Sequence, residues 1–180
     1  MACDLGAGRG VLCKDVVGGL DAVYFINYDE VTGYTYDATN TDVIETITGG
    51  GTINAYKYEL KGNSSFEQTI NSSTDNGTTF FEQVLNLTLK KQDLATHKEV
   101  KLLAFGRPRV VVKDHNNNYF VCGLNWGAEV TGGTISTGAA MGDLSGYTLT
   151  LTAMEKIPAN FMEATDDAGL ATAGLTVVTG

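Results

Sequence analysis

The feature that most constrains the fold is a long run of alternating side chains between residues 78 and 91. One series in this run is strongly apolar apart from one glutamine, and consists of Phe81, Gln83, Leu85, Leu87 and Leu89, interleaved with a mostly polar series. Because successive side chains of a β-strand point to opposite faces, the run predicts a half-buried strand. Residues 146–152 alternate in the same way, with threonines on one face. Two strands with one apolar face each require a covered sheet, which favours a mainly β fold.

A single helix is predicted over residues 93–105. Asp93 is a suitable N-cap, and Pro108 forbids continuation beyond the C-terminal end. Gly106 stands where a left-handed C-terminal residue is common. We expect the apolar residues of this helix to cover a sheet face; they are Leu94, Val100, Leu102, Leu103 and Phe105.

Further strands are indicated on both sides of this helix. Residues 23–28 form an expected core strand, and residues 109–113 and 119–124 an expected hairpin around the polar turn 114–118. The alternation at 52–61, the run 64–73 and the Asn76-Gly77 turn predict that residues 52–91 are a meander of three antiparallel strands.

The 180 residues are most simply one domain. We expect an antiparallel sandwich or barrel-like β core over 20–157, with one packed helix near 93–105, an N-terminal arm over 1–19 and a C-terminal arm over 158–180. The N-terminal arm has too little apolar surface to fold alone and is expected to order against a neighbour, and the C-terminal arm is expected to be disordered or to dock on a neighbouring subunit. Residues 34–51 are interpreted as a mobile excursion with an edge strand at 43–47, and 125–144 as a glycine-rich loop with a strand at 130–135.

Charge excludes some classes of partner. Twelve basic and 21 acidic side chains give a net charge of −9, which disfavours tight nucleic-acid binding. The sequence has no apolar run long enough to cross a membrane and no signal-peptide pattern at residue 1, so we expect no membrane partner.

Residues able to carry catalysis or bind a metal are few. The histidines are His97 and His115, and the cysteines Cys3, Cys13 and Cys122 have no close-pair spacing. No serine-nucleophile motif is present, and the carboxylates show no calcium-loop spacing. We therefore expect no enzyme activity, no metal and no cofactor, and three reduced thiols.

Several segments resemble structural proteins of tailed bacteriophages. They are 103–108 (LAFGRP), 130–134 (VTGGT) and 142–151 (GDLSGYTLTL). The opening residues 1–4, Gly8-Arg9, 13–15 and Gly18-Gly19 are similar to the start of such proteins from phages of Bacteroidetes-type hosts. The order of strands, helix and glycine-rich loop is similar to the tail tube fold, which pairs two packed sheets with a helix and stacks rings around a DNA channel.

The resemblance implies a non-catalytic virion subunit, assembled in the host cytoplasm, whose partners are copies of itself and other virion structural proteins. A tail tube protein is the first reading, and a head auxiliary or capsid decoration protein is the alternative. The aromatic residues Trp126, Tyr119 and Tyr147 leave a carbohydrate-binding module as a minor alternative. The predicted intersubunit contacts are Leu5, Arg9, Val11, Leu12, Val43, Ile44, Trp126, Ile135, Phe161, Leu170 and Leu175.

Overall fold

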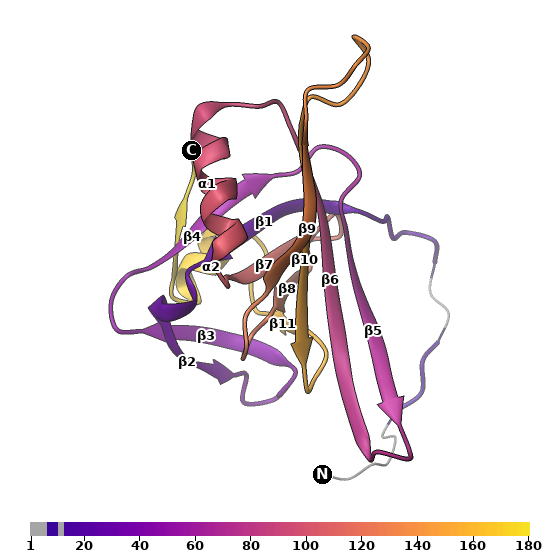
Figure 1. Ribbon diagram of the computed structural model, residues 1–180. Coiled ribbons are helices and arrows are strands. Elements are labelled where there is room, and N and C mark those ends of the chain that lie inside the picture. The colour runs from indigo at the N-terminus through magenta and orange to yellow at the C-terminus, as the bar shows by residue number, and fades with distance from the viewer. Residues whose placement is uncertain (1–6, 11–12) are drawn as a thin grey trace.

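The strands form two sheets in the computed structural model, which describes residues 7–10 and 13–180 (Figure 1). Sheet A has eight strands in the order β12 (Leu175–Val178), β4 (Ile53–Glu59), β1 (Leu20–Ile26), β7 (Arg109–Asp114), β8 (Tyr119–Cys122), β11 (Asn160–Met162), β3 (Val43–Gly49) and β2 (Val31–Tyr36). Sheet B has four strands in the order β5 (Ser65–Ser73), β6 (Thr78–Lys90), β10 (Gly146–Glu155) and β9 (Glu129–Ser136). The helical elements are η1 (Tyr28–Glu30), α1 (Leu94–Phe105) and α2 (Asp167–Thr172). The predicted mainly β fold with a helix near 93–105 is confirmed.

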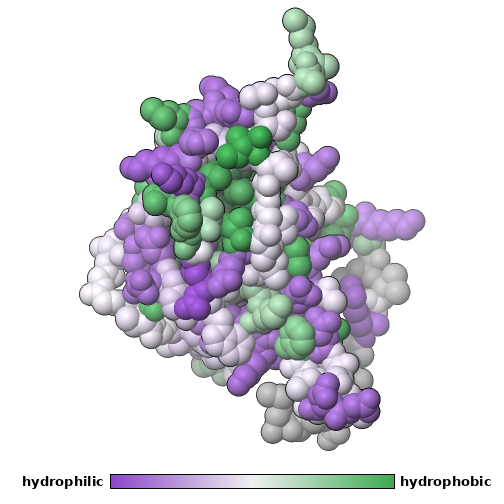
Figure 2. Space-filling view, viewed as in Figure 1, coloured by the Kyte–Doolittle hydropathy of each residue, from purple (hydrophilic) through white to green (hydrophobic). Residues whose placement is uncertain are grey.

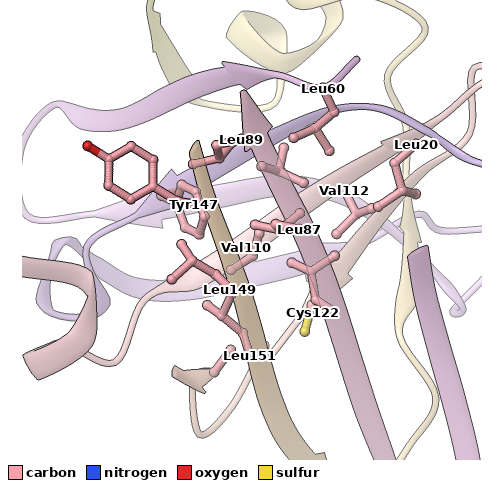
Figure 3. Close-up of a cluster of buried hydrophobic side chains, with 14 of the residues drawn as sticks. Leu20, Leu60, Leu87, Leu89, Val110, Val112, Cys122, Tyr147, Leu149 and Leu151 are labelled. Carbon is pink, nitrogen blue, oxygen red and sulfur yellow. The ribbon is translucent and has the colours of Figure 1, made fainter. Parts of the chain in front are cut away.

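An inter-sheet core fills the space between the two sheets. Figure 3 shows Leu87 and Leu89 of β6 and Tyr147, Leu149 and Leu151 of β10 facing side chains of sheet A. All five are on the face predicted from the alternation, and all are buried. At about 25 cal/mol per Å² of apolar surface removed from water, such burial is the main force that holds sheet B on sheet A.

A second core lies on the opposite face of sheet A. It contains Tyr24 and Ile26 of β1, Val111 of β7 and Ile44 of β3. β1 and β7 are therefore buried on both faces, which explains why they are continuous apolar runs rather than alternating ones.

The segment before β12 contacts β3, which lies near the opposite end of sheet A. The Ile47 N–H of β3 donates to the carbonyl of Ala173 at 2.8 Å. Gly174 follows with φ +93°, and a Cβ there would stand 2.4 Å from the Ile47 carbonyl oxygen. Only glycine fits this close approach, and the contact gives sheet A a barrel-like closure around the second core.

The predicted three-strand meander is wrong in one respect. β5 and β6 pair as expected, but β4 pairs with β1 and β12 in sheet A. The chain crosses between sheets at residues 60–64, where Gly62 takes φ +138°. Ile53 and Ala55 of β4 belong to the second core, whereas Tyr58 on its other face packs against the inter-sheet core.

Residues 34–51 are also more ordered than expected. They belong to the β2–β3 hairpin, which pairs from Val31–Gly49 to Tyr36–Ile44 at the edge of sheet A. The strands expected at 23–28, 43–47, 130–135 and 146–152 are present as β1, β3, β9 and β10, as is the β7–β8 hairpin.

Helix α1 has the predicted start but not the predicted packing. The Asp93 carboxylate accepts the Thr96 N–H at 2.8 Å, as an N-cap does. Gly106 is extended (φ −90°, ψ 173°) rather than left-handed. Val100 and Leu103 pack on the inter-sheet core, whereas the other three apolar residues are exposed. The apolar residues are spread around the helix, so a single covered face cannot contain them all.

The prediction of a C-terminal arm at 158–180 is wrong for this fold. β11 pairs with β8 and in parallel with β3, and β12 pairs in parallel with β4. Leu170 of α2 and Leu175 of β12 are buried in the second core. The apolar residues of this segment pack within their own chain, where they cover the face of sheet A that points away from sheet B.

Candidate assembly interface

The two edges of sheet B are the most prominent candidate interaction feature. Within the described residues, β5 pairs only with β6 and β9 only with β10. The outer edges of β5 and β9 therefore present backbone N–H and C=O groups that no other described strand takes up. Such edges are templates for pairing with another chain.

Apolar side chains mark the core-facing side of both edges. Ile135 of β9 lies opposite Tyr147, and Ile70 of β5 lies opposite Phe81, so both follow the inward-facing register. Ile135 is 53% exposed and Ile70 is 67% exposed. Their exposure follows from the absence of a further strand beside them among the described residues. Figure 2 shows hydrophobic side chains gathered between α1 and the β9–β10 side of sheet B.

The outer face of sheet B is polar and rich in threonine. Hydroxyl ladders cross it, with Thr131 and Thr152 at 3.0 Å, and Thr134 and Thr148 at 2.7 Å. The glutamates Glu67, Glu82 and Glu129 lie on this face, and Lys90 lies at the end of β6. The face is thus mildly acidic, and it repels rather than attracts a polyanion.

Two buried polar side chains tie sheet B to the turn after β8. The Gln83 Oε1 atom accepts the Gly123 N–H at 3.0 Å. One carboxylate oxygen of Glu155 accepts the N–H groups of Asn125 and Trp126, and the other accepts the Asn125 side-chain amide. Both side chains are 1% exposed, so these bonds form in a low-dielectric site where they hold the two sheets in one register.

An arginine side chain also holds this turn in place. Arg109 donates through Nε to the Leu124 carbonyl at 2.7 Å and through Nη1 to the Tyr28 carbonyl. Its guanidinium lies 4.1 Å from the Tyr28 ring centroid, and that of Arg107 lies 4.2 Å away from it. Burial lowers the pKa of Arg109 from its ordinary value.

These network residues were missed by sequence reasoning. Gln83 and Glu155 occupy inward positions of strands whose other inward residues are apolar. A buried polar residue must be hydrogen-bonded. A lone polar residue within an apolar inward series was therefore the sequence signal that could have revealed this network.

The residues predicted as intersubunit contacts fall into several groups. Trp126 (46% exposed), Ile135 and Phe161 (45%) reach the surface, Val43 is partly buried, and Arg9 is exposed. Ile44, Leu170 and Leu175 are at most 1% exposed within the second core, so in this fold they are not available to a neighbour. Leu5, Val11 and Leu12 lie outside the described residues.

Trp126 is presented by the rigid turn described above. It lines a groove with Arg107, Thr131 and Met154, and the Lys156 ammonium lies 5.9 Å from its ring. Of the other aromatic residues considered for sugar binding, Tyr119 and Tyr147 are each 1% exposed and belong to the cores. They cannot form a sugar platform with Trp126.

The histidines and cysteines are dispersed. The exposed His97 packs against Tyr147 with ring centroids 6.2 Å apart, and His115 lies beside Gly19. Cys13 is exposed, whereas Cys122 is buried, and burial raises the pKa of its thiol to about 12. In the described part of the chain, no three His, Cys, Asp or Glu side chains are grouped as a metal site requires.

None of the helices between residues 7 and 180 that the structure describes is both long and apolar enough to span a membrane. No protein-family model, curated protein or solved structure matches this chain.

Proposed function

We propose that this chain is a non-catalytic structural subunit of a tailed-phage virion, and that it assembles as a tail tube protein into rings around a DNA channel. The segments that resemble phage structural proteins support the virion class. The geometry of sheet B supports ring formation.

The direction of the strands in sheet B carries the proposal. Each neighbouring pair, β5–β6, β6–β10 and β10–β9, is antiparallel. β5 and β9 therefore run in opposite directions at the two edges. When identical copies stand side by side in one orientation, β9 of one copy meets β5 of the next as an antiparallel pair. Repetition of this heterologous contact closes a ring if the rotation per subunit divides a full turn.

The chemistry of the two faces fits this arrangement. Pairing of β9 with β5 buries Ile135 and Ile70, the exposed apolar residues of the two edges. The threonine-rich, acidic outer face of sheet B then lines the channel. A lining without clustered lysine or arginine does not hold DNA phosphates, so DNA can slide through it.

Negative-stain electron microscopy at high protein concentration, with mass photometry beside it, tests the proposal. We expect rings or hollow tubes. A stable monomer or small compact oligomer at all concentrations contradicts the ring assembly. Binding to empty capsid shells then tests the alternative role as a capsid decoration protein.

The variant Ile135→Lys tests the edge itself. An inward-pointing charge on an edge strand blocks strand addition, while a side chain that is already 53% exposed tolerates lysine in the monomer. We expect a folded protein that forms no rings. Thr39→Lys adds the same charge at an exposed position between β2 and β3 and is expected to leave the rings intact.

A further inference from the structure

Helix α1 carries an unpartnered stripe on its outer side. Leu94, Lys98, Lys101 and Phe105 are spaced i, i+4, i+7 and i+11, so they fall on one face of the helix. Leu94 is 88% exposed and Phe105 is 86% exposed, and Leu102 beside them is 55% exposed. Two large apolar side chains with two lysines between them form a surface suited to an apolar partner with acidic surroundings.

A second apolar surface, with acidic rather than basic residues near it, lies on another part of the molecule. The rings of Phe66, Phe120 and Phe161 follow one another from β5 to β8 to β11, with centroids 6.2 Å and 4.7 Å apart. Phe161 at the end of this row is 45% exposed. Val43 lies opposite Phe161 in the register of β3 and β11, so it is on the same face of sheet A.

Three acidic residues lie on the segments next to the exposed end of the phenylalanine row. The Asp42 carbonyl accepts the Phe161 N–H at 3.1 Å, and Glu163, just after β11, donates its N–H to the Ile44 carbonyl of β3 at 2.9 Å. Glu45 follows Val43 on the same side of β3. Asp42, Glu45 and Glu163 are all exposed. Their negative charge complements Lys98 and Lys101 of α1.

The two surfaces are on opposite flanks of the protein. α1 contacts β9 at one edge of sheet B, and Phe66 belongs to β5 at the other edge. Figure 1 shows α1 and β5 on opposite sides of the β6–β10 pair. A contact between the edges of β9 and β5 in adjacent copies therefore brings α1 of the first copy toward the phenylalanine row of the second.

We propose that the α1 stripe of one copy docks on the Phe120–Phe161 surface of the next copy, outside the paired edges of sheet B. This inference rests on the proposed ring assembly and names a second, outer layer of the same interface. Leu94 and Phe105 pack on the phenylalanine row, and Lys98 and Lys101 face Asp42, Glu45 and Glu163. Apolar contact supplies the affinity, and charge complementarity fixes the orientation of the two copies.

Site-specific cross-linking of mixed variants tests which surfaces meet. In a background with Cys3 and Cys13 replaced by serine, Leu102→Cys is made in one protein and Val43→Cys in another. Both substitutions leave the proposed packing and charged side chains in place. We expect a short bis-maleimide to cross-link the mixture under assembly conditions but neither variant alone. As the matched control, Met141→Cys replaces Val43→Cys in the mixture, and it is expected to give no cross-link because Met141 lies in the β9–β10 loop.

The outcomes separate the docking from the ring assembly. Rings without a Leu102–Val43 cross-link overturn the docking and leave the proposed function standing. A cross-link of either variant with itself indicates a two-fold contact and also overturns the docking. A protein that stays monomeric under all conditions contradicts both proposals.

A charge exchange provides the second measurement. Lys101→Glu places like charges at the contact, and we expect it to weaken ring formation about tenfold. Glu163→Lys in the same chain is expected to restore assembly. If the double variant assembles no better than Lys101→Glu alone, these side chains do not face one another.

Discussion

Replacement of Leu175 with alanine tests whether the C-terminal segment is part of the fold. Leu175 is 1% exposed and packs in the second core. Removal of a fully buried leucine side chain costs about 2–5 kcal/mol, which combines lost transfer free energy and the cavity left behind. For a chain of this length, each kcal/mol lowers the melting temperature by about 2–4 °C. We therefore expect Leu175→Ala to melt about 4–20 °C below the parent protein.

The assay is thermal unfolding followed by circular dichroism, on monomeric protein so that assembly does not contribute. Val178→Ala is the matched control, because Val178 lies in the same strand but is 37% exposed. We expect the control to melt within a few degrees of the parent. If Leu175→Ala behaves like Val178→Ala, β12 is not packed in solution, and the segment is an arm after all.

Three further predictions concern single residues. Cys122 should not react with a thiol reagent in the folded protein, because it is buried and its pKa is raised to about 12; a Cys3→Ser, Cys13→Ser variant that labels rapidly without denaturant contradicts this. Gly174→Ala should destabilise the protein by roughly 1–3 kcal/mol in urea unfolding, because of its positive φ and the close Ile47 carbonyl, whereas Gly132→Ala, which meets no atom within 4 Å, should have a small effect. Burial alone raises the pKa of Asp167, but hydrogen bonds from Lys57 and Tyr24 outweigh it and hold the pKa below its ordinary value. The ionised form therefore stabilises the fold above about pH 4 and this contribution is lost as the pH falls further; Asp167→Asn should show a smaller loss of melting temperature in acid, and an unchanged acid profile refutes the assignment.

Local patterns in the sequence were sufficient to predict much of the β structure. The alternation in β6 and β10 identified the buried faces, because each strand has one side in the inter-sheet core and one side toward solvent. The Asp93 cap located the start of α1, because an N-cap depends only on hydrogen bonds within the first turn of the helix.

The pairing between distant segments could not be predicted in this way. β4 alternates as well as β6 does, but its partners β1 and β12 are chosen by the shape of the second core. The residues after 157 look like an arm because they are small and only intermittently apolar. Leu170 and Leu175 become core residues only when sheet A provides a surface for them.

The residues predicted as contacts and the candidate interface overlap only in part. Ile135 and Phe161 were predicted as contacts and are exposed, but the prediction also included Leu170 and Leu175, because apolar residues outside regular strands look alike in sequence. The lysine-bearing stripe on α1 was not recognised as a surface, since Leu94 and Phe105 were assigned to the interior. Which apolar residues of a helix face outward depends on how the helix rests on the sheet.

The parallel pairing of β12 with β4 also governs when the chain can finish folding during synthesis. Leu175 lies opposite Ile53, so β4 leaves the ribosome long before its neighbour β12 has been synthesised. All strands of sheet B lie within residues 65–155 and can pair earlier. Contacts between such distant residues form slowly, and until they form the second core stays open to solvent. A nascent chain interrupted before residue 175 therefore has no complete sheet A, although all four strands of sheet B are already present.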